Sequence, residues 1–274
     1  MPAINTNSAA NSAVRYLNIN SAQESSALSK LSSGSRITSA SDDAAGLAIS
    51  TRISSDITTL QQAATNTSEA TAILQTADGG ASNISDILAR MKSLASESAS
   101  GTVTDSSRTY INSEFSQLTS EINSIASGTR YSSQSLLDGT SVFASGVSVL
   151  VGSQSTDTIT ISLSSLTATS LGVSTLDVST QADANTALTA LDSAINTVSA
   201  ARADIGAQES RFNFSADSIS TQTQNLQSAN SAISDVDIAS EQATLSSAEV
   251  KTQAAVSAEA AANQMPQYLL KLLG

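Results

Sequence analysis

The sequence predicts a mainly α-helical protein, a long antiparallel helical coiled-coil bundle with one small β-hairpin insertion. Its only two prolines, Pro2 and Pro266, lie near the ends of the 274 residues, so no proline breaks a helix between them. An apolar residue recurs at every seventh position between 191 and 233, which is the repeat of a left-handed coiled coil. Aromatic residues make up only 3% of the chain, and small side chains suit thin seams between paired helices.

Both ends of the chain carry weak amphipathic helical patterns. Ordering a residue costs about 1 to 2 kcal/mol of backbone entropy, and such thin apolar faces do not offset that cost. We therefore expect both ends to be disordered in a free monomer. Their apolar residues are Val14, Leu17, Leu28 and Leu31 at the front, and Ile238, Leu245 and Val256 at the back.

The first long helix is predicted from about residue 43 to residue 98, with apolar residues at helical spacing throughout. Ser39 and Asp42 fit a capping box at its start, and Asp43 adds negative charge at the positive helix end. The pair Gly79-Gly80 is the position where a bend is most expected, because each glycine costs about 1 kcal/mol against alanine.

A third helix follows the turn SGTVTDSSR at 100–108, with Asp105 as its predicted N-cap and apolar positions from Ile111 to Ile125. Beyond it the apolar period changes from helix to strand. Alternating apolar residues at 147–152 and 157–163 flank a short polar loop. They predict a β-hairpin near 140–175 as the only sheet.

The second long helix is predicted from Asp183, its expected N-cap, to about Ser234. A strict heptad repeat keeps one seam of the helix against a partner, here the first long helix. The predicted intrachain coiled-coil seam comprises Ile53, Leu60, Leu191, Val198, Ile205, Phe212, Ile219 and Leu226.

Composition excludes several classes of function. The chain has no Cys and no His, which removes thiolate and histidine metal sites and the Ser-His-Asp and Cys-His forms of catalysis. There are 24 acidic residues against 12 basic ones, a formal net charge of −12, and no basic run that could neutralise phosphates. We therefore expect no enzyme activity and no cofactor, and neither nucleic acid nor membrane as a partner.

Three stretches resemble bacterial flagellin, the subunit of the flagellar filament. They are LSSGSRITSASDDAAGLAIS at 31–50, TRYSSQSLLDG at 129–139, and the run from RADIGAQESRF at 202 to AANQMPQYLLKLLG at 274. Their order and spacing agree with the predicted helix boundaries. The resemblance implies a structural protein that self-assembles into the helical filament, the propeller for swimming motility.

The resemblance also implies how the chain divides. In the family the chain ends form antiparallel helices lining an inner tube, so we expect a discontinuous inner domain of residues 1–42 and 236–274. Residues 43–235 then form an outer helical domain with the β-hairpin. The stretch between Thr129 and Asp183 is short, which indicates a minimal form without projecting outer domains.

Partners and location follow from the same resemblance. The chain is expected to bind copies of itself as a helical homopolymer, and to meet a flagellar export chaperone, hook-junction proteins and cap proteins. Its first 30 residues have neither a basic start nor an apolar run. This fits export through the flagellar type III route to the extracellular filament, without a cleaved signal peptide.

The contacts for polymerisation are expected on the terminal helices and the tail LLKLLG. Burying each tail leucine between subunits would contribute about 1.5 to 3 kcal/mol. Arg36, in the connector before the first long helix, is expected to tether the acidic helix start or an adjacent subunit. The predicted polymerisation interface comprises Val14, Leu17, Leu28, Leu31, Arg36, Leu245, Val256, Leu269, Leu270, Leu272 and Leu273.

The segment LARMKSLASES at 88–98 resembles the part that a Toll-like receptor reads in some flagellins. Arg90, Leu94 and Glu114 match residues used there, so they form a possible innate-receptor segment. Lys92-Ser93 departs from the Arg-Glu pair typical of recognised sequences. A simpler interpretation has Leu94 packed in the bundle and Arg90 in solvent or against the next subunit.

Three other functions stay open. The nearest is a flagellin-like junction protein between hook and filament, which should not elongate a filament from seeds. An enzyme would need a metal motif in the middle of the chain, and the sequence has none there. A detached coiled-coil adhesin or effector does not explain two ends that look unable to fold alone.

Overall fold

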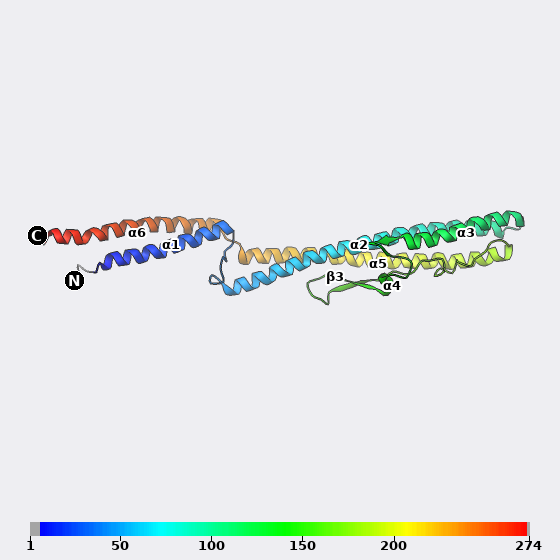
Figure 1. Cartoon of the computed structure of the whole chain (residues 1–274), viewed down its shortest axis with the longest axis horizontal. Helices are drawn as coiled ribbons and strands as arrows, with labels where there is room; N and C mark the ends of the chain where they lie inside the picture. The colour runs from blue at the N-terminus through cyan, green and yellow to red at the C-terminus, as the bar shows by residue number, and fades with distance from the viewer. Residues whose placement is uncertain (1–5, 273–274) are drawn as a thin grey trace. The chain divides into compact units, whose positions relative to one another are not determined.

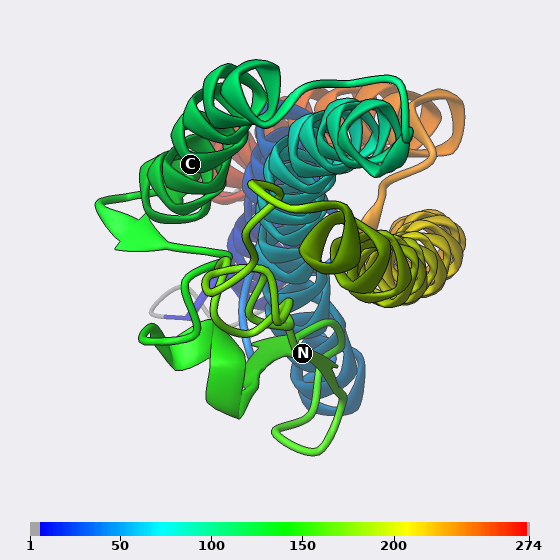
Figure 2. The same cartoon turned by 90° about the vertical axis from the view of Figure 1, so that its right-hand side faces the viewer.

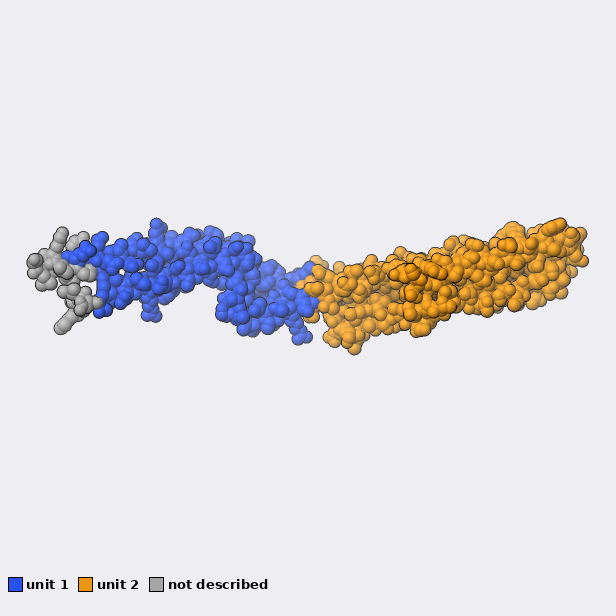
Figure 3. Space-filling view, in the orientation of Figure 1, with its two compact units in different colours: residues 1–55, 225–274 blue, residues 56–224 orange. Residues whose placement is uncertain are grey.

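The computed structural model describes residues 6–272, apart from the side chains of residues 266 and 268–272. Contacts divide the chain into two compact units, which Figure 3 shows in two colours. Unit 1 comprises residues 1–55 and 225–274, and unit 2 comprises residues 56–224.

Both divisions fall inside the two longest helices, α2 (Ala44–Ala99) and α5 (Gln181–Ser234). The predicted domain boundaries, after residue 42 and after residue 235, lie at the ends of these helices instead. They follow the family's division into inner and outer domains and do not depend on contacts within the chain. The division into inner and outer domains stays a prediction, and the two units are described separately below.

Unit 1 contains the terminal helices α1 (Ser8–Ser33) and α6 (Ile238–Leu272), which pack against each other in an antiparallel pair (Figure 1). Their seam is built mainly from alanine. Small side chains let the two helices approach closely, but they bury little apolar area. The buried seam residues are Ala13, Ala27, Leu245, Ala248, Ala255 and Ala262.

Two ties fix the register of α1 against α6. At one end the side chain of Asn7 caps α1 and donates its Nδ2 to the Ala262 carbonyl at 2.7 Å. At the other end an isolated antiparallel bridge pairs Ser35 with Asp235. It follows directly on Gly34, whose φ of 70° ends α1 in the left-handed conformation. Whether the pair is ordered in a free monomer stays a prediction.

The start of α2 differs from the predicted capping box. Asp43 is the cap, because its Oδ1 accepts from the N–H of Gly46 at 2.8 Å. The Oδ2 of Asp42 instead accepts from the N–H groups of Thr38 at 3.1 Å and Ser39 at 3.0 Å, and so closes the turn before the helix. A hydrogen bond from the Thr38 hydroxyl is the largest cause that lowers the pKa of Asp42, and the two N–H groups add to it.

The helix α2 continues without interruption through Gly79-Gly80. A β-carbon at Gly80 would lie 2.4 Å from Thr129 Oγ1 and 2.9 Å from Leu137 Cδ1, so a side chain there has no room. Gly79 faces open space. One of the two glycines therefore serves close packing of the segment after α3 (Asp105–Gly128) against α2.

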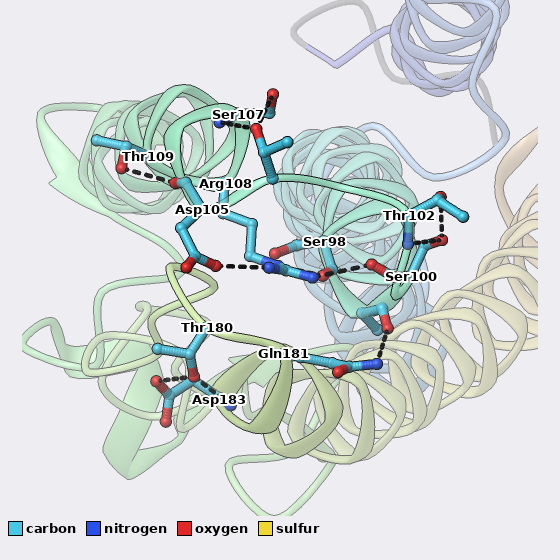
Figure 4. A network of polar contacts seen from close by, with 12 residues as sticks. Ser98, Ser100, Thr102, Asp105, Ser107, Arg108, Thr109, Thr180, Gln181 and Asp183 are labelled. Carbon is cyan, nitrogen blue, oxygen red and sulfur yellow. Dashed lines mark hydrogen bonds and ion pairs between the residues drawn. The ribbon is translucent and has the colours of Figure 1, made fainter.

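Arg108 in α3 ties the end of α2 to the start of α3 (Figure 4). Its buried guanidinium donates to the carbonyls of Ser98 and Ser100, each at 2.9 Å, and pairs with the Asp105 carboxylate at 2.7 Å. Gln181, at the start of α5, donates to a third carbonyl of the same helix end at 2.9 Å. These donors satisfy carbonyls that no helical N–H can reach, and they join α2, α3 and α5 at one point.

Threonines rather than aspartates cap α3 and α5. Thr104 caps α3, since its Oγ1 accepts from the N–H three residues later at 3.3 Å, so Asp105 is the first helical residue. Thr180 caps α5 by accepting from the N–H of Asp183 at 3.1 Å, and it donates its hydroxyl to the Asp183 carboxylate at 2.6 Å. Both predicted caps therefore lie in the first turn, where their charge still favours the positive helix end.

The predicted hairpin is formed by β3 (Val147–Leu150) and β4 (Thr158–Ile161), after the short helix α4 (Val142–Ser145). The strands are antiparallel, with Val147 opposite Ile161 and Leu150 opposite Thr158. Ile159 and Ile161 are buried, so one face of this hairpin packs on the helices of unit 2.

The structure adds a second two-stranded sheet, β1 (Arg130–Tyr131) with β2 (Gln134–Ser135). The turn between them places Ser132 and Ser133 at φ values of 47° and 67°. These are the left-handed values of a type I′ turn, which Asn and Gly usually supply. Because two serines occupy the turn, the sequence carries no hairpin signal there.

The core of unit 2 lies between α2, α3, α5 and the segment that carries the hairpin, which Figure 2 views end on. Its largest fully buried side chains come from all of these parts and form one contiguous cluster. They include Leu74, Ile84, Leu88, Met91, Phe115, Ile122, Leu136, Leu137, Ile161, Leu166 and Phe212.

Candidate interaction surfaces

The α1–α6 pair exposes many large apolar side chains. Among the predicted interface residues, Val14 and Val256 are exposed and Leu28 is 58% exposed, whereas Leu17 and Leu31 are half-buried. Leu245 is buried in the seam between the two helices. The pair therefore uses one apolar face internally and leaves others open to solvent.

Two shallow grooves follow the line between α1 and α6. The first, of about 410 Å³, is lined by Ala13 and Tyr16 of α1 and by alanines of α6. The second, of about 380 Å³, is lined by Gln23 of α1 and by small residues of α6, and Lys251 lies between the two. The grooves exist because the alanine side chains at the seam are too small to fill the space between the two helices.

The tail residues of the predicted interface cannot be placed in the same way. Leu269, Leu270 and Leu272 belong to α6 by their backbone, but their side chains are not among those described. Leu273 lies outside the described residues. The contribution of the tail to an interface stays a prediction.

Arg36 contacts the end of α5 rather than the acids at the start of α2. Its guanidinium donates to the Ile233 carbonyl at 2.6 Å, and its N–H donates to the Ser234 carbonyl at 2.6 Å. A cation at a helix C-terminus is favoured by the unpaired carbonyls and the helix dipole. The side chain remains exposed, so the predicted contact with an adjacent subunit stays open.

Most heptad positions of α5 are buried, as expected for one side of a helix seam. Leu191, Val198, Ile205, Phe212 and Ile219 are buried, while Leu226 is half-buried. On α2, Leu60 is buried and Ile53 half-buried.

A polar interruption lies beside this seam. Arg202 pairs with Asp78 of α2, with Nε and Oδ1 2.8 Å apart, and this hydrogen bond is the main cause that raises the pKa of Arg202. Glu209 lies two turns further along α5. Burial raises the pKa of the Glu209 carboxyl, and the charge of Asp78 adds to the effect.

The predicted receptor segment joins α2 and α3. Arg90 and Glu114 form an exposed ion pair, with the guanidinium and Oε1 2.6 Å apart. Leu94 is 2% exposed and packs in the core of unit 2. Lys92 pairs with Asp192 of α5. Recognition by an innate receptor stays a prediction.

Residues that the sequence reasoning missed extend the apolar surface of unit 1. Val14 and Leu17 lie on one side of the buried line from Ala13 to Ala27 on α1, and Tyr16 and Ile19 lie on the other. The apolar residues therefore cover a wider arc of α1 than one partner helix covers. That pattern was the available signal. The additional exposed residues are Tyr16, Ile19, Ile49, Val250 and Met265, and Ile238, which the terminal pattern already included, is exposed as well.

Chemistry of other kinds finds little support in the described part of the chain. No group of three acidic side chains within residues 6–272 is arranged to hold a metal ion. In the same range, none of the helices has an apolar stretch of the length needed to cross a membrane.

Comparison with known sequences covers nearly the whole chain. Residues 4–142 match the profile of the bacterial flagellin N-terminal helical region, and residues 188–273 match that of the bacterial flagellin C-terminal helical region. The chain is 36% identical over 272 residues to the flagellin of Halalkalibacterium halodurans, covering 98% of this chain and 99% of that protein. It is 35% identical over 282 residues to the flagellar filament 30.7 kDa core protein of Treponema maltophilum, with the same coverage.

Comparison with solved structures leads to the same group. The crystal structure of Bacillus cereus flagellin superposes with a TM-score of 0.52 at 32% sequence identity, over 61% of this chain and 94% of that one. The similarity in sequence extends over the terminal helices and the long helices alike.

Proposed function

Because this chain belongs to the bacterial flagellin family and is a structural, non-enzymatic subunit of the flagellar filament, we propose that its α1–α6 pair supplies the main contacts of polymerisation. The observation that carries this proposal is the distribution of apolar side chains on α1. They spread to both sides of the buried alanine seam, while α6 is the one helix that packs along α1 among the described residues. The uncovered faces are available to neighbouring copies.

The thin seam supports the same proposal from the energetic side. Alanine contributes less to stability than leucine or phenylalanine because it buries less apolar area. A pair of helices held mainly by alanine gains most of its burial only when other copies cover Val14, Leu28 and Val256. The tail leucines, Leu269 to Leu273, would add to that covered area in the polymer.

We further propose that residues 1–42 and 236–274 act as the inner domain of the filament and residues 43–235 as the outer one. The support is that the α1–α6 pair carries the exposed apolar faces. An inner position would remove these faces from water, and the more polar unit 2 would remain outside.

The proposal extends to partners and export on the strength of family membership. The chain would meet an export chaperone, hook-junction proteins and a cap protein, and would leave the cell through the flagellar type III route. Cells that lack this export apparatus should retain the full-length chain. Secretion at the normal level from such cells would contradict the proposed route.

The central test is elongation from seeds. Purified chain is added to short filament fragments, and filament length is followed by electron microscopy. Deletion of residues 265–274 is expected to abolish growth, and Leu28→Ser to raise the critical concentration, because both remove apolar contacts. Val142→Ser is the matched control, since Val142 in unit 2 is as exposed as Leu28, at 58%. Normal growth of the truncated chain would overturn the proposal.

Arg36 offers a second test of the same surface. Its bond to the Ile233 carbonyl holds the connector against α5, so Arg36→Glu is expected to weaken that tie and change filament length or shape. Filaments of the variant that match wild type in both respects would remove Arg36 from the proposed interface.

A further inference from the structure

The packing of α2 along α5 involves two rows of buried residues, each of which repeats every seven positions. If α5 slid along α2 by one heptad, the residues of one row would again lie against residues of the other. Such a slip costs only the mismatch in side-chain size, so the two rows alone define the register weakly. The rows comprise Leu191, Val198, Ile205, Phe212 and Ile219 on α5, and Leu60, Thr67, Leu74, Ala81, Leu88 and Ala95 on α2.

A second line on α5 lies beside the buried row and changes in character from one heptad to the next. Two of its polar residues are bonded to α2. Arg202 forms a bidentate pair with Asp78, with Nε and Oδ1 2.8 Å apart and Nη2 and Oδ2 3.2 Å apart. Asn230 accepts a hydrogen bond from the Ser50 hydroxyl at 2.7 Å. Four heptads separate Arg202 from Asn230, and four separate Asp78 from Ser50, so both bonds belong to the same register. The line comprises Leu188, Ile195, Arg202, Glu209, Ala216, Thr223 and Asn230.

The Asp78–Arg202 pair contributes more to specificity than to stability. Both side chains are more than a third exposed, and ion pairs in that setting stabilise a fold only slightly. A bidentate pair between arginine and a carboxylate nevertheless requires one relative placement of the two helices. Arg202 has no acid three or four positions away on α5, and Asp78 has no base at those spacings on α2. Each therefore depends on the other helix for its partner.

A slip by one heptad separates this pair in either direction. In one direction Glu209 takes the position opposite Asp78, where two carboxylates repel each other. Arg202 would then approach Asp86, but this does not remove the repulsion at Asp78. In the other direction Ile195 lies opposite Asp78, and the carboxylate loses its partner against an apolar side chain. Charge thus disfavours both neighbouring registers, although the buried rows accept them.

We propose that Asp78 and Arg202, with Glu209 one heptad further along, select the register in which α2 and α5 fold together. A slip by one heptad would displace the surface of α5 along that of α2 by about 10.5 Å. Copies in different registers would not be equivalent, and a helical polymer is built from equivalent copies. The selection takes place within one chain, so it can be tested apart from the filament contacts proposed above, and either proposal can fail without the other.

Disulfide cross-linking reports the register, because the chain has no cysteine of its own. Ala216→Cys on α5 is combined, in three separate chains, with one cysteine on α2. Ala64→Cys reports the native register, since Ala64 and Ala216 line the same groove. Ile57→Cys and Thr71→Cys, one heptad to either side, report the two slips, because about 10.5 Å along a helix exceeds the reach of a disulfide. Each full-length chain is refolded from denaturant and then oxidised, and the cross-linked peptides are quantified by mass spectrometry.

Asp78→Leu tests one direction of slip, because its apolar side chain would lie opposite Ile195 in the slipped register. The cross-link from Ile57→Cys is expected to rise about tenfold over the wild-type background, and more than that from Thr71→Cys. The midpoint of thermal unfolding should change little, since Asp78 is partly exposed. Glu114→Leu is the matched control. It removes an acid of similar exposure from an ion pair between α2 and α3, and it should leave all three cross-links unchanged.

Glu209→Arg tests the other direction, because an arginine there would pair with Asp78 in the slipped register. Glu209 has no hydrogen bond or ion pair within residues 6–272, so the substitution removes no native contact of this kind. The cross-link from Thr71→Cys should rise about tenfold, while that from Ile57→Cys stays at background. The native cross-link alone in either variant overturns the proposal, and so does an equal rise of both slips with Glu209→Arg. If Asp78→Leu does not refold, Glu209→Arg decides by the same criteria.

Discussion

The two units of this chain differ in charge and in where their apolar side chains lie. Unit 1 has 8 acidic and 6 basic residues, whereas unit 2 has 16 acidic and 6 basic ones. Unit 2 buries most of its large apolar residues in one cluster and leaves Tyr110, Val142 and Phe214 exposed. Unit 1 buries mostly alanine and leaves nine large apolar residues exposed among those described.

This contrast separates two sources of stability within one chain. The core of unit 2 resembles that of an ordinary globular domain, with bulky side chains fully removed from water. Unit 1 is nearly neutral and exposes several large apolar side chains, so neighbouring copies can cover it without strong repulsion. The excess of negative charge in unit 2 keeps that part soluble in either state. We therefore expect the stability of the fold to depend mainly on unit 2 and assembly to depend mainly on unit 1.

The strongest test of this contrast removes one large side chain from each unit. Phe115→Ala in unit 2 is expected to lower the free energy of unfolding by about 3 to 5 kcal/mol, because it leaves a cavity in the core. Leu245→Ala in unit 1 should shift the monomer transition much less, because we expect α1 and α6 to be disordered in the free monomer, but it should raise the critical concentration for filament growth. Chemical denaturation and seeded elongation measure the two effects. Equal losses of monomer stability would remove the contrast.

The next effect concerns the clamp at the end of α2. Arg108→Met keeps much of the apolar stem but removes the donor to the Ser98 carbonyl, one of two donors to the Ser100 carbonyl and the ion pair with Asp105, so we expect a loss of about 2 to 3 kcal/mol in unfolding free energy. Arg211→Met is the control in the same unit, because Arg211 is exposed and unpaired within residues 56–224. If both variants melted alike, the clamp would contribute nothing to unit 2.

Alanine substitutions at the two adjacent glycines of α2 are expected to change stability by smaller amounts and in opposite directions. Gly80→Ala is expected to destabilise unit 2 by about 1 to 3 kcal/mol, because its β-carbon would overlap Thr129 and Leu137. Gly79→Ala should stabilise the chain by about 0.5 to 1 kcal/mol, since it faces open space within a helix. Thermal unfolding of the two variants reports the difference. Stabilisation by both substitutions would mean that the close contact at Gly80 is unimportant.

The smallest effect is a dependence on pH. A carboxyl whose pKa is raised by folding, such as Glu209, favours the folded state at low pH and loses this contribution as pH rises through the raised pKa. Glu209→Gln should therefore gain stability relative to wild type between about pH 4 and pH 7, by less than about 1 kcal/mol.

Asp138 gives the control with the opposite sign. The N–H of Thr140 is the largest cause that lowers the pKa of Asp138, so this carboxylate stabilises the fold above its ordinary pKa and the contribution is lost as pH falls. Asp138→Asn should therefore lose stability relative to wild type as pH rises to about 4, below the range in which Glu209→Gln acts, and the difference should stay constant at higher pH. Parallel curves for both variants in denaturation at several pH values would contradict the assignment.

Much of the helical architecture could be predicted because it depends on periodicity. The seven-residue repeat of α5 and the absence of internal proline indicate long helices, and α2 and α5 end within about two residues of the predicted positions. The N-caps were harder to predict, because Thr104 and Thr180 lie close to aspartates that are equally good N-cap residues. The turn at Ser132-Ser133 carried no signal at all.

The candidate surfaces were only partly predictable for a related reason. Apolar residues at helical spacing, such as Leu28 and Val256, indicate a face that needs a partner, but they do not say which face the chain itself covers. Tyr16 and Phe214 are exposed because of how α6 and α2 pack, which only the fold determines. The isolated charge of Arg211 likewise depends on contacts made elsewhere in unit 2.

The two ties of the α1–α6 pair limit how the protein can change in evolution. The span from Asn7 to Ser35 contains nearly as many residues as the span from Asp235 to Ala262, and each tie joins one end of the first span to one end of the second. Inserting one residue in either helix moves everything beyond it by about 1.5 Å and turns it by about 100°. Insertions and deletions in α1 and α6 should therefore be tolerated only as compensating pairs, whereas the loop between β3 and β4 is free to vary in length.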